Sequence, residues 1–245
     1  MDSVEAADAS GDAISTITSL FMMDMDTYAH GGELGFDGVD FYISGRGGVL
    51  GDAPASVVVA AFGFWTPQVI VKGWEQSAGV MPRRQAAEEF AGVSHRWAEA
   101  HVPDGFDAAR LAELAGRISD GATVAAAPLY AGWLELDEPG DDRPAALAIH
   151  RMNALRELRG AMHASAVLCQ GIHPHAAVSL ASAHFLGLYG WGDPHPGAEA
   201  ARPRWKDAMA ATEVAMAPAY EALSGEERAE FVSLANDLKA AVTQG

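Results

Sequence analysis

Hydrophobic residues recur at helical spacing along most of the chain. Phe90, Val93 and Trp97, for example, lie three and four positions apart and would share one face of a helix over residues 83–101. A short run of β-branched residues, 57–59, leaves a strand there as the alternative to a helix. The pattern of apolar positions and helix signals predicts further helices over residues 13–28, 36–44, 54–65, 66–76, 107–118, 143–171, 173–183, 203–223 and 224–244.

Glycine, proline and acidic residues divide these predicted helices into segments. Residues 1–11 are acidic and poor in large apolar side chains, and we expect them to form a disordered tail. Glycines crowd residues 31–52, which predicts turns, whereas residues 121–142 combine prolines with acids and predict a linker. The expected fold is therefore all-α, with one helical domain over residues 12–120 and a second over residues 143–245.

The charge of the chain limits its partners. Among 245 residues, 33 are acidic and 16 are basic, which gives a formal charge of −17. Such a surface repels nucleic-acid backbones and anionic membranes, so neither is an expected partner. The single cysteine, Cys169, excludes an intramolecular disulfide. The most apolar stretch, residues 53–71, is interrupted by Pro67, and the acidic N-terminus differs from a signal peptide, so we expect a soluble cytoplasmic protein.

The segment from residue 149 to residue 168 holds the most informative polar side chains. Arginine forks can hold a carboxylate or a phosphate, and a histidine beside them could transfer a proton as the catalytic residue. The alternative is structural, with the arginines paired to acids of the linker and the histidine in the core. The four side chains recur at steps of three and four and would lie near one another on one helix face: Asn153, Arg156, Arg159 and His163.

Candidate ligand contacts also come from the rest of the chain. Arg46 follows Tyr42 in a glycine-rich stretch that resembles a phosphate-binding loop only weakly, and it is otherwise a structural counter-ion for acids. Phe64 and Trp74 belong to an aromatic group that either packs in the core or stacks on a flat ligand. Trp191, in a glycine-rich loop, is a candidate lid over such a ligand.

Histidines leave a metal or haem protein as an alternative. His173 and His175 flank a proline, and His163 lies ten positions earlier. A zinc site needs three or four converging ligands, and no spacing such as H-E-x-x-H or C-x-x-C occurs. We therefore assign no metal ligand, and the sequence leaves the cofactor undefined.

Two parts of the chain resemble a known family. The segment LRELRGAMHASAV (residues 155–167), together with FYISGRGG (residues 41–48) and FGF (residues 62–64), resembles the actinobacterial SalK-like helix-turn-helix proteins. The last two predicted helices are similar to the C-terminal helices through which MarR-type regulators dimerise. The resemblance implies a degenerate tandem helix-turn-helix or winged-helix-like architecture, with the motif at residues 161–171 and 172–183, and a homodimer through the C-terminal helices.

The chain departs from the MarR pattern at two places. Residues 187–202, where a further helix and a basic wing would follow the motif, are too few and too rich in proline for both. The expected recognition helix, residues 173–183, has no lysine, arginine, asparagine or glutamine to read base edges. DNA binding is therefore not the first expectation.

Three functions stay open on the sequence alone. The first is a dimeric protein that binds an anionic or aromatic small molecule, or an enzyme of secondary metabolism that uses His163 and the arginines for acid–base chemistry. Its pocket would lie between residues 42–46, residues 62–74 and the arginine–histidine face. The second is a degenerate MarR-like DNA-binding regulator. The third is a metal- or haem-binding protein.

Overall fold

The computed structural model describes residues 1–243, which fold into twelve α-helices and three 3₁₀ turns without a strand. The expectation of an all-α, multi-helix fold is confirmed, and the valine run at residues 57–59 belongs to a helix. Over the same residues, none of the helices has the length and apolar composition that a bilayer span needs. The elements are α1 (Ser3–Met23), α2 (Met25–Glu33), α3 (Asp40–Gly47), η1 (Gly48–Leu50), α4 (Ala55–Phe62), α5 (Pro67–Gln76), η2 (Ser77–Gly79), α6 (Arg83–His101), α7 (Ala108–Asp120), α8 (Pro128–Trp133), α9 (Pro144–Cys169), α10 (Pro174–Ala181), η3 (Ala183–Phe185), α11 (Ala198–Tyr220) and α12 (Gly225–Thr243).

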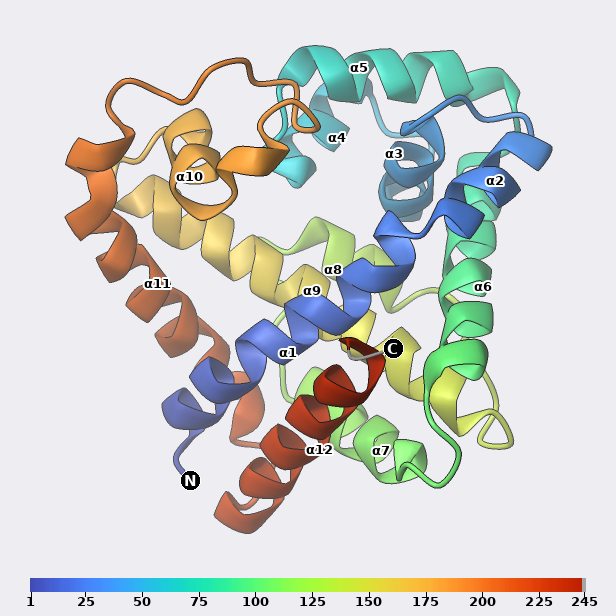
Figure 1. The fold of residues 1–245 in the computed structure, drawn as a ribbon, viewed down its shortest axis with the longest axis vertical. Helices are drawn as coiled ribbons and strands as arrows, with labels where there is room; N and C mark the ends of the chain where they lie inside the picture. The colour runs from blue at the N-terminus through green and yellow to red at the C-terminus, as the bar shows by residue number, and fades with distance from the viewer. Residues whose placement is uncertain (244–245) are drawn as a thin grey trace.

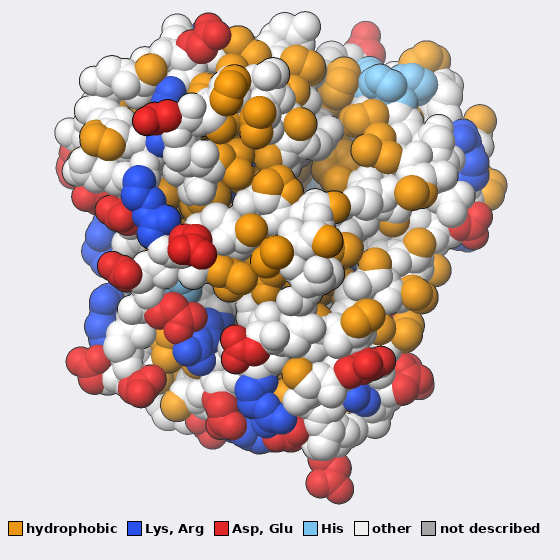
Figure 2. Space-filling view, turned by 180° about the vertical axis from the view of Figure 1, so that it is seen from behind, with side chains coloured by type: hydrophobic (Ala, Val, Ile, Leu, Met, Phe, Trp, Pro, Cys, Tyr) orange, Lys and Arg blue, Asp and Glu red, His pale blue; other side chains and the backbone are white. Residues whose placement is uncertain are grey.

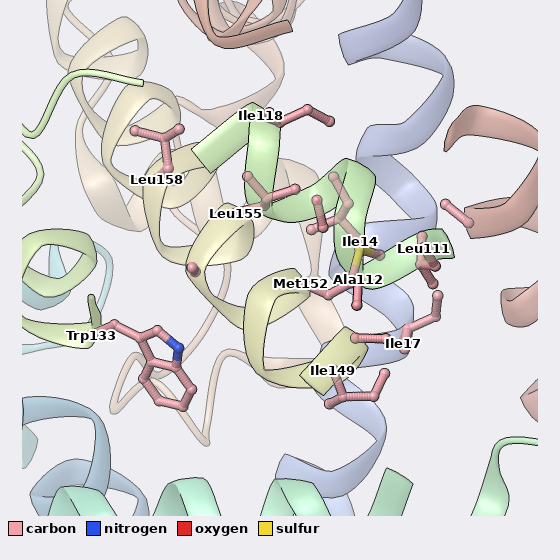
Figure 3. Close-up of a cluster of buried hydrophobic side chains, with 14 of the residues drawn as sticks. Ile14, Ile17, Leu111, Ala112, Ile118, Trp133, Ile149, Met152, Leu155 and Leu158 are labelled. Atoms are coloured by element: carbon pink, nitrogen blue, oxygen red, sulfur yellow. The ribbon is translucent and has the colours of Figure 1, made fainter. Parts of the chain in front are cut away.

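The long helix α9 is the centre of the molecule, where it lies behind α1 in Figure 1 and also packs against α6, α7 and α11. Aliphatic side chains of α9 meet those of α1 and α7 in the core, as Figure 3 shows. Met152 and Leu155 of α9, Ile14 of α1 and Leu111 of α7 are fully buried there. Burying one such side chain contributes about 1.5–3 kcal/mol. The core therefore fixes α9, which carries four of the predicted site residues.

The N-terminal segment belongs to this core, which corrects the disordered tail expected at residues 1–11. Asp2 caps α1, because its carboxylate accepts the backbone N–H of Glu5 at 2.8 Å and the Glu5 carboxylate accepts the N–H of Asp2. Ser10 is buried, and its hydroxyl bonds that of Tyr220 in α11 at 2.7 Å. The expectation was wrong because small residues, rather than large apolar ones, form the buried face of this turn of helix.

Residues 121–142 are also packed, so the linker expected there is not observed. They contain α8, whose Tyr130 and Trp133 are among the largest fully buried side chains. The Trp133 indole N–H donates to the carbonyl of His150 in α9 at 3.1 Å. One cluster of buried hydrophobic residues extends from α1 to α12, and both predicted helical domains contribute to it. The prolines of this segment start a helix and turns instead of separating two domains.

Helix boundaries follow the sequence signals at several places. α6 has its predicted bounds, and α9 continues through Gly160 without a break. α12 begins with the predicted capping box, in which Ser224 Oγ accepts the N–H of Glu227 at 3.2 Å and the Glu227 carboxylate accepts the N–H of Ser224 at 2.8 Å. The last residue of the predicted helix, Gln244, lies outside the described residues.

The two C-terminal helices pack within the chain. Phe231, Ala235 and Leu238 of α12 are fully buried, and α12 contacts α1 and α7. The place of a wing, between α10 and α11, holds η3 and a loop. The apolar face of α12 is therefore covered by its own chain and is not free to bind a second copy. The homodimer through the C-terminal helices stays a prediction.

Candidate functional site

A buried ion pair between α3 and α9 organises the candidate site. The Arg46 guanidinium donates from Nε to Glu157 Oε1 at 2.8 Å and from Nη2 to Oε2 at 2.7 Å. Its Nη1 donates to the Tyr42 hydroxyl at 2.7 Å, and Arg156 donates from Nη1 to Glu157 Oε1 at 2.8 Å. The side chains of the pair are only 11% and 6% exposed. Three predicted residues, Tyr42, Arg46 and Arg156, are thus brought together by a glutamate that the sequence did not single out.

Both members of this pair are charged despite their burial. Burial acts to lower the pKa of Arg46, but the charge of Glu157 and the hydrogen bonds that Arg46 donates to Glu157 and Tyr42 outweigh burial and raise that pKa. Burial acts to raise the pKa of Glu157, but the charges of Arg46 and Arg156 hold it below its usual value. The Arg46 guanidinium also lies 4.7 Å from the ring centroid of Phe62. Arg46 is therefore a counter-ion of Glu157, which is the structural alternative considered for it.

A cleft of about 120 Å³ opens beside the ion pair. Tyr42 and Arg156 line it, together with Trp65 and Tyr189. The Trp65 ring centroid lies 4.8 Å from that of Tyr189 and 5.5 Å from that of Tyr42, so these rings form a continuous aromatic wall. The remaining lining residues come from α1, α2, η3 and the segment after η3: Ser19, Met22, Met23, Tyr28, Phe185 and Leu188.

Two side chains at the wall of this cleft, Tyr42 and Arg156, keep hydrogen-bond donors available. The Tyr42 hydroxyl oxygen accepts from Arg46, so its own hydrogen can donate to a group in the cleft. Within residues 1–243 the Arg156 guanidinium makes a hydrogen bond only through Nη1, and its side chain is 21% exposed, which leaves Nε and Nη2 for a ligand. The pKa values of Tyr28 and Tyr189 are both raised, mainly because the side chains are buried and to a smaller extent because Tyr42 is close. Both phenols are therefore neutral at pH 7. The cleft therefore offers one cationic fork and neutral hydroxyls between aromatic rings.

Arg159 and His163 contact α11 instead of this cleft. Arg159 Nη2 donates to Glu213 Oε1 at 2.5 Å, and His163 Nδ1 lies 3.1 Å from Thr212 Oγ1. The pKa of His163 is lowered to about 4, mainly by burial and to a smaller extent by the charge of Arg159. Its ring is therefore neutral at pH 7. The seven positions from Arg156 to His163 correspond to about 10 Å along the helix, and different helices cover the two places. This corrects the predicted pocket that combined Arg156 with His163.

None of the other predicted residues lines this cleft, although Trp74 lines a second, more open one of about 550 Å³ beside Arg83. The Trp74 indole N–H donates to the carbonyl of Ala53 at 3.1 Å. The Trp191 indole N–H donates to the carbonyl of Phe64 at 2.8 Å, and its ring stacks on a histidine of α10. Asn153 is fully buried, and neither polar atom of its side chain has a partner within the described residues. Trp191 therefore holds two segments together rather than covering the cleft as a lid.

Three histidines gather beside Trp191 at the start of α10. The ring centroid of His195 lies 5.7 Å from that of His173 and 5.2 Å from that of His175. Nδ1 of His173 accepts the N–H of His175 at 3.2 Å, and Nδ1 of His195 accepts the N–H of Gly197 at 3.0 Å, which are bonds of local turns. Among residues 1–243, no three His, Cys, Asp or Glu side chains are arranged to hold a metal ion. This histidine cluster therefore does not support the metal-binding alternative.

Trp65 and Tyr189 are among the cleft residues that the sequence analysis did not choose. Each is close in sequence to a residue that was chosen, Phe64 and Trp191 respectively. Their segments are joined by a bond from the N–H of Thr66 to the carbonyl of Tyr189 at 2.9 Å. A contact between segments so far apart leaves no local pattern, and only the aromatic character of both residues was a signal.

α9 and α10, joined by a turn, lie where the helix-turn-helix motif was expected. Gly171 in this turn has a φ of 64°, a left-handed conformation that favours glycine after a helix. α10 carries no lysine, arginine, asparagine or glutamine. Basic side chains occur instead in α11, where Arg204 Nη1 donates to the carbonyls of Gln170 and Gly171. Arg204, which lies beside the turn, is thus engaged by backbone carbonyls at the C-terminal end of α9.

The chain is similar to one described family. A family model for a helix-turn-helix family matches residues 7–211. The comparisons with curated proteins and with solved structures found no match. The matched range includes every residue that lines the cleft as well as the α9–α10 pair.

Proposed function

The chain belongs to this helix-turn-helix family, and we propose that it binds a small aromatic anion in the cleft beside the buried ion pair of α3 and α9. The observation that carries the proposal is Arg156, which has unused guanidinium donors and lines a cleft walled by Tyr42, Trp65 and Tyr189. Arginine binds carboxylates through two parallel hydrogen bonds, and aromatic side chains pack well on a planar ring.

Charge and size both favour a single-ring carboxylate. Arg46 and Arg156 face one carboxylate, Glu157, so the cluster retains one uncompensated positive charge beside the cleft. An engineered protein cavity of about 150 Å³ holds benzene, and the volume here is about 120 Å³. This volume is smaller than that cavity but the cleft opens to solvent, so a single ring is the largest aromatic group that it can take, with its carboxylate at Arg156 and a further acceptor at the Tyr42 hydroxyl.

The test is calorimetric titration with benzoate and with its neutral analogue benzamide. We expect benzoate to bind more tightly, and Arg156→Gln to weaken benzoate binding roughly tenfold while leaving benzamide unchanged. Arg151→Gln is the matched control, because Arg151 lies on the same helix but pairs with Glu138 at the surface. Absence of benzoate binding up to about 10 mM, or an equal loss in the control, would contradict the proposal.

A DNA-binding regulator is the second candidate, and the family match favours it. Arg202, Arg204 and Lys206 are exposed near the start of α11, beside the turn between α9 and α10. Arg202 pairs with Glu199, whereas Lys206 forms no ion pair among the described residues. Because α10 has no side chain that reads base edges through two hydrogen bonds, we expect weak binding through phosphates with little sequence preference.

Fluorescence anisotropy with a labelled duplex at about 20 mM salt tests this candidate. Lys206→Ala should weaken binding and make it less dependent on salt, since one phosphate contact is lost. Lys239→Ala is the control, because Lys239 pairs with Asp12 on α1. If the wild-type protein does not bind the duplex at this salt concentration, the regulator candidate fails.

The segments that resemble the actinobacterial SalK-like proteins, residues 155–167 and 41–48, contain Arg156 and Arg46 of the proposed site. A cytoplasmic location is part of the same proposal. The enzyme of secondary metabolism receives less support, because the predicted proton carrier, His163, bonds Thr212 of α11 and does not line the cleft.

A further inference from the structure

Arg83, the first residue of α6, is a buried arginine whose hydrogen bonds all go to neutral groups. The residue is only 9% exposed. Its Nη1 donates to Ser77 Oγ at 3.0 Å, and its Nη2 donates to the carbonyl of Trp74 at 2.5 Å. The guanidinium carbon also lies 3.7 Å from the ring centroid of Trp74. Within residues 1–243 Arg83 forms no ion pair, so its charge is left without an anionic partner.

This arrangement differs from that of other arginines in the protein. Arg46 and Arg159, whose side chains are also shielded from solvent, each bind a buried glutamate. On the face drawn in Figure 2, blue Lys and Arg side chains lie beside red Asp and Glu side chains. Burial lowers the pKa of Arg83, and the charge of Asp52 offsets this effect only in part. Because a buried charge without compensation is costly, the carboxylate of a ligand would stabilise Arg83.

A ligand can reach Arg83 from the open cleft of about 550 Å³, which we call the Arg83 cleft. Within the described residues Arg83 Nε makes no hydrogen bond, yet it is not sealed from solvent like the buried polar atoms that lack a partner. Pro82, at the start of α6, also lines the cleft. The first turn of α6 has neither a side-chain cap nor an acidic residue, so its backbone N–H groups favour an anion as well. Val80 and Met81 add apolar surface to the wall.

The Arg83 cleft also carries a negative charge, on Asp52. This side chain is exposed and lines the cleft, whereas Arg83 is buried. The charge of Asp52 acts on Arg83, so the two groups are near each other, but they form no ion pair within residues 1–243. Two opposite charges that share a cleft without pairing fit a ligand that carries both a carboxylate and an ammonium group. Arg83 suits the carboxylate at the inner end, and Asp52 suits the ammonium group at the rim.

We propose that the Arg83 cleft binds a free α-amino acid with an apolar side chain. The carboxylate binds Arg83 and the start of α6, the ammonium group binds Asp52, and the side chain packs on Val80 and Met81. A plain anion is a poorer ligand, because Asp52 repels it and gains no partner from it. The Arg83 cleft shares no lining residue with the cleft beside Arg156, so this proposal does not depend on benzoate binding.

The experiment is calorimetric titration at pH 7 with L-leucine and with two analogues that each lack one of its charges. Isocaproate has no ammonium group, and L-leucinamide has no carboxylate. We expect L-leucine to bind with a Kd below about 1 mM and each analogue to bind roughly tenfold more weakly. Asp52→Asn should weaken L-leucine binding roughly tenfold and remove its advantage over isocaproate. Asp37→Asn is the control, because Asp37 is also exposed but does not line the cleft.

Arg83→Gln should remove the advantage of L-leucine over L-leucinamide. Thermal unfolding checks that this variant folds, and if it does not, Asp52→Asn still decides, because Asp52 is exposed. Arg156→Gln should leave L-leucine binding unchanged. The proposal is overturned if L-leucine does not bind up to about 10 mM, or if isocaproate binds the wild type as tightly as L-leucine does. It is also overturned if Arg156→Gln abolishes L-leucine binding, which would place the amino acid in the other cleft.

Discussion

Arg46 of α3 and Glu157 of α9, which are 111 positions apart in the sequence, form a bidentate ion pair in the interior. The pair joins the first helices of the chain to the central helix and holds Tyr42 and Arg156 at the edge of the cleft. Both charges are largely shielded from bulk water, so each depends on the other for compensation. The cleft and the stability of the fold therefore share the same residues.

Removing one member of this pair should be costly. In Arg46→Met the buried Glu157 loses its bidentate partner and keeps only one bond, from Arg156, so we expect the free energy of unfolding to fall by about 3–5 kcal/mol. Arg110→Met is the control, because Arg110 pairs with Glu113 and Glu230 at the surface, where water screens the charges and the loss should be much smaller. Urea unfolding followed by circular dichroism compares the two variants, and equal losses would contradict the importance assigned to burial.

Acid should destabilise the protein through His95 and His150, whose rings are hydrogen-bonded at 3.1 Å in the core. Burial is the main cause that lowers the pKa of His95 to about 3 and that of His150 to about 4, from an ordinary 6.5. Below pH 6.5 the unfolded chain therefore binds more protons than the folded one. The contribution of each histidine to the free energy of unfolding is therefore fully present above pH 6.5. It is lost as the pH falls toward the pKa of the folded state, and the loss at pH 5 is about 1–2 kcal/mol per histidine.

Urea unfolding at pH 7 and at pH 5 measures this loss. His150→Gln should reduce the difference in stability between the two pH values, because one buried histidine no longer takes up a proton on unfolding. His184→Gln, at an exposed position after α10, should leave the difference unchanged. If His150→Gln and the wild type lose the same stability between pH 7 and pH 5, the acid sensitivity has another origin.

Helix positions could be predicted from the sequence wherever large apolar residues mark a buried face. Phe90, Val93 and Trp97 fixed α6 in this way, and all three are buried. The start of α1 was missed because alanine, serine and glycine form its buried face, which carries no hydrophobic period. Tyr130 and Trp133 show the opposite case, since prolines and acids around α8 concealed a well-buried helix.

The candidate site could be predicted only in part. Periodicity places Arg156, Arg159 and His163 along one helix, but it does not tell which neighbouring helix covers each of them. The partners Glu157 and Glu213 are acidic residues in a chain with 33 of them, so nothing local distinguished them. The aromatic wall of the cleft depends on contacts between residues near 42, 65 and 189, which only the tertiary structure brings together.

The close crossing of α3 and α6 should depend on Gly45. A methyl group at Gly45 would overlap the side chain of Phe90, which is fully buried, so Gly45→Ala should lower stability by about 1–3 kcal/mol. Gly32→Ala is the control, because a methyl group there meets nothing within 4 Å and α2 should gain up to about 1 kcal/mol. Thermal unfolding compares the stabilities of the two variants. If Gly45→Ala is as stable as the wild type, α3 and α6 can move apart to accept the methyl group.

Arg159 and Arg156 should respond to substitution in opposite ways. Arg159 is the partner of buried Glu213, whose second oxygen has no hydrogen bond among the described residues, and burial already raises the pKa of Glu213. Arg159→Met should therefore lower the free energy of unfolding by about 3 kcal/mol, and adding Glu213→Gln should restore part of it. Benzoate affinity should not change, because Arg159 does not line the cleft. Arg156→Gln should do the reverse, losing benzoate affinity with little loss of stability, because Arg46 still compensates Glu157. A folded Arg159→Met variant that fails to bind benzoate would instead place both arginines in one anion site.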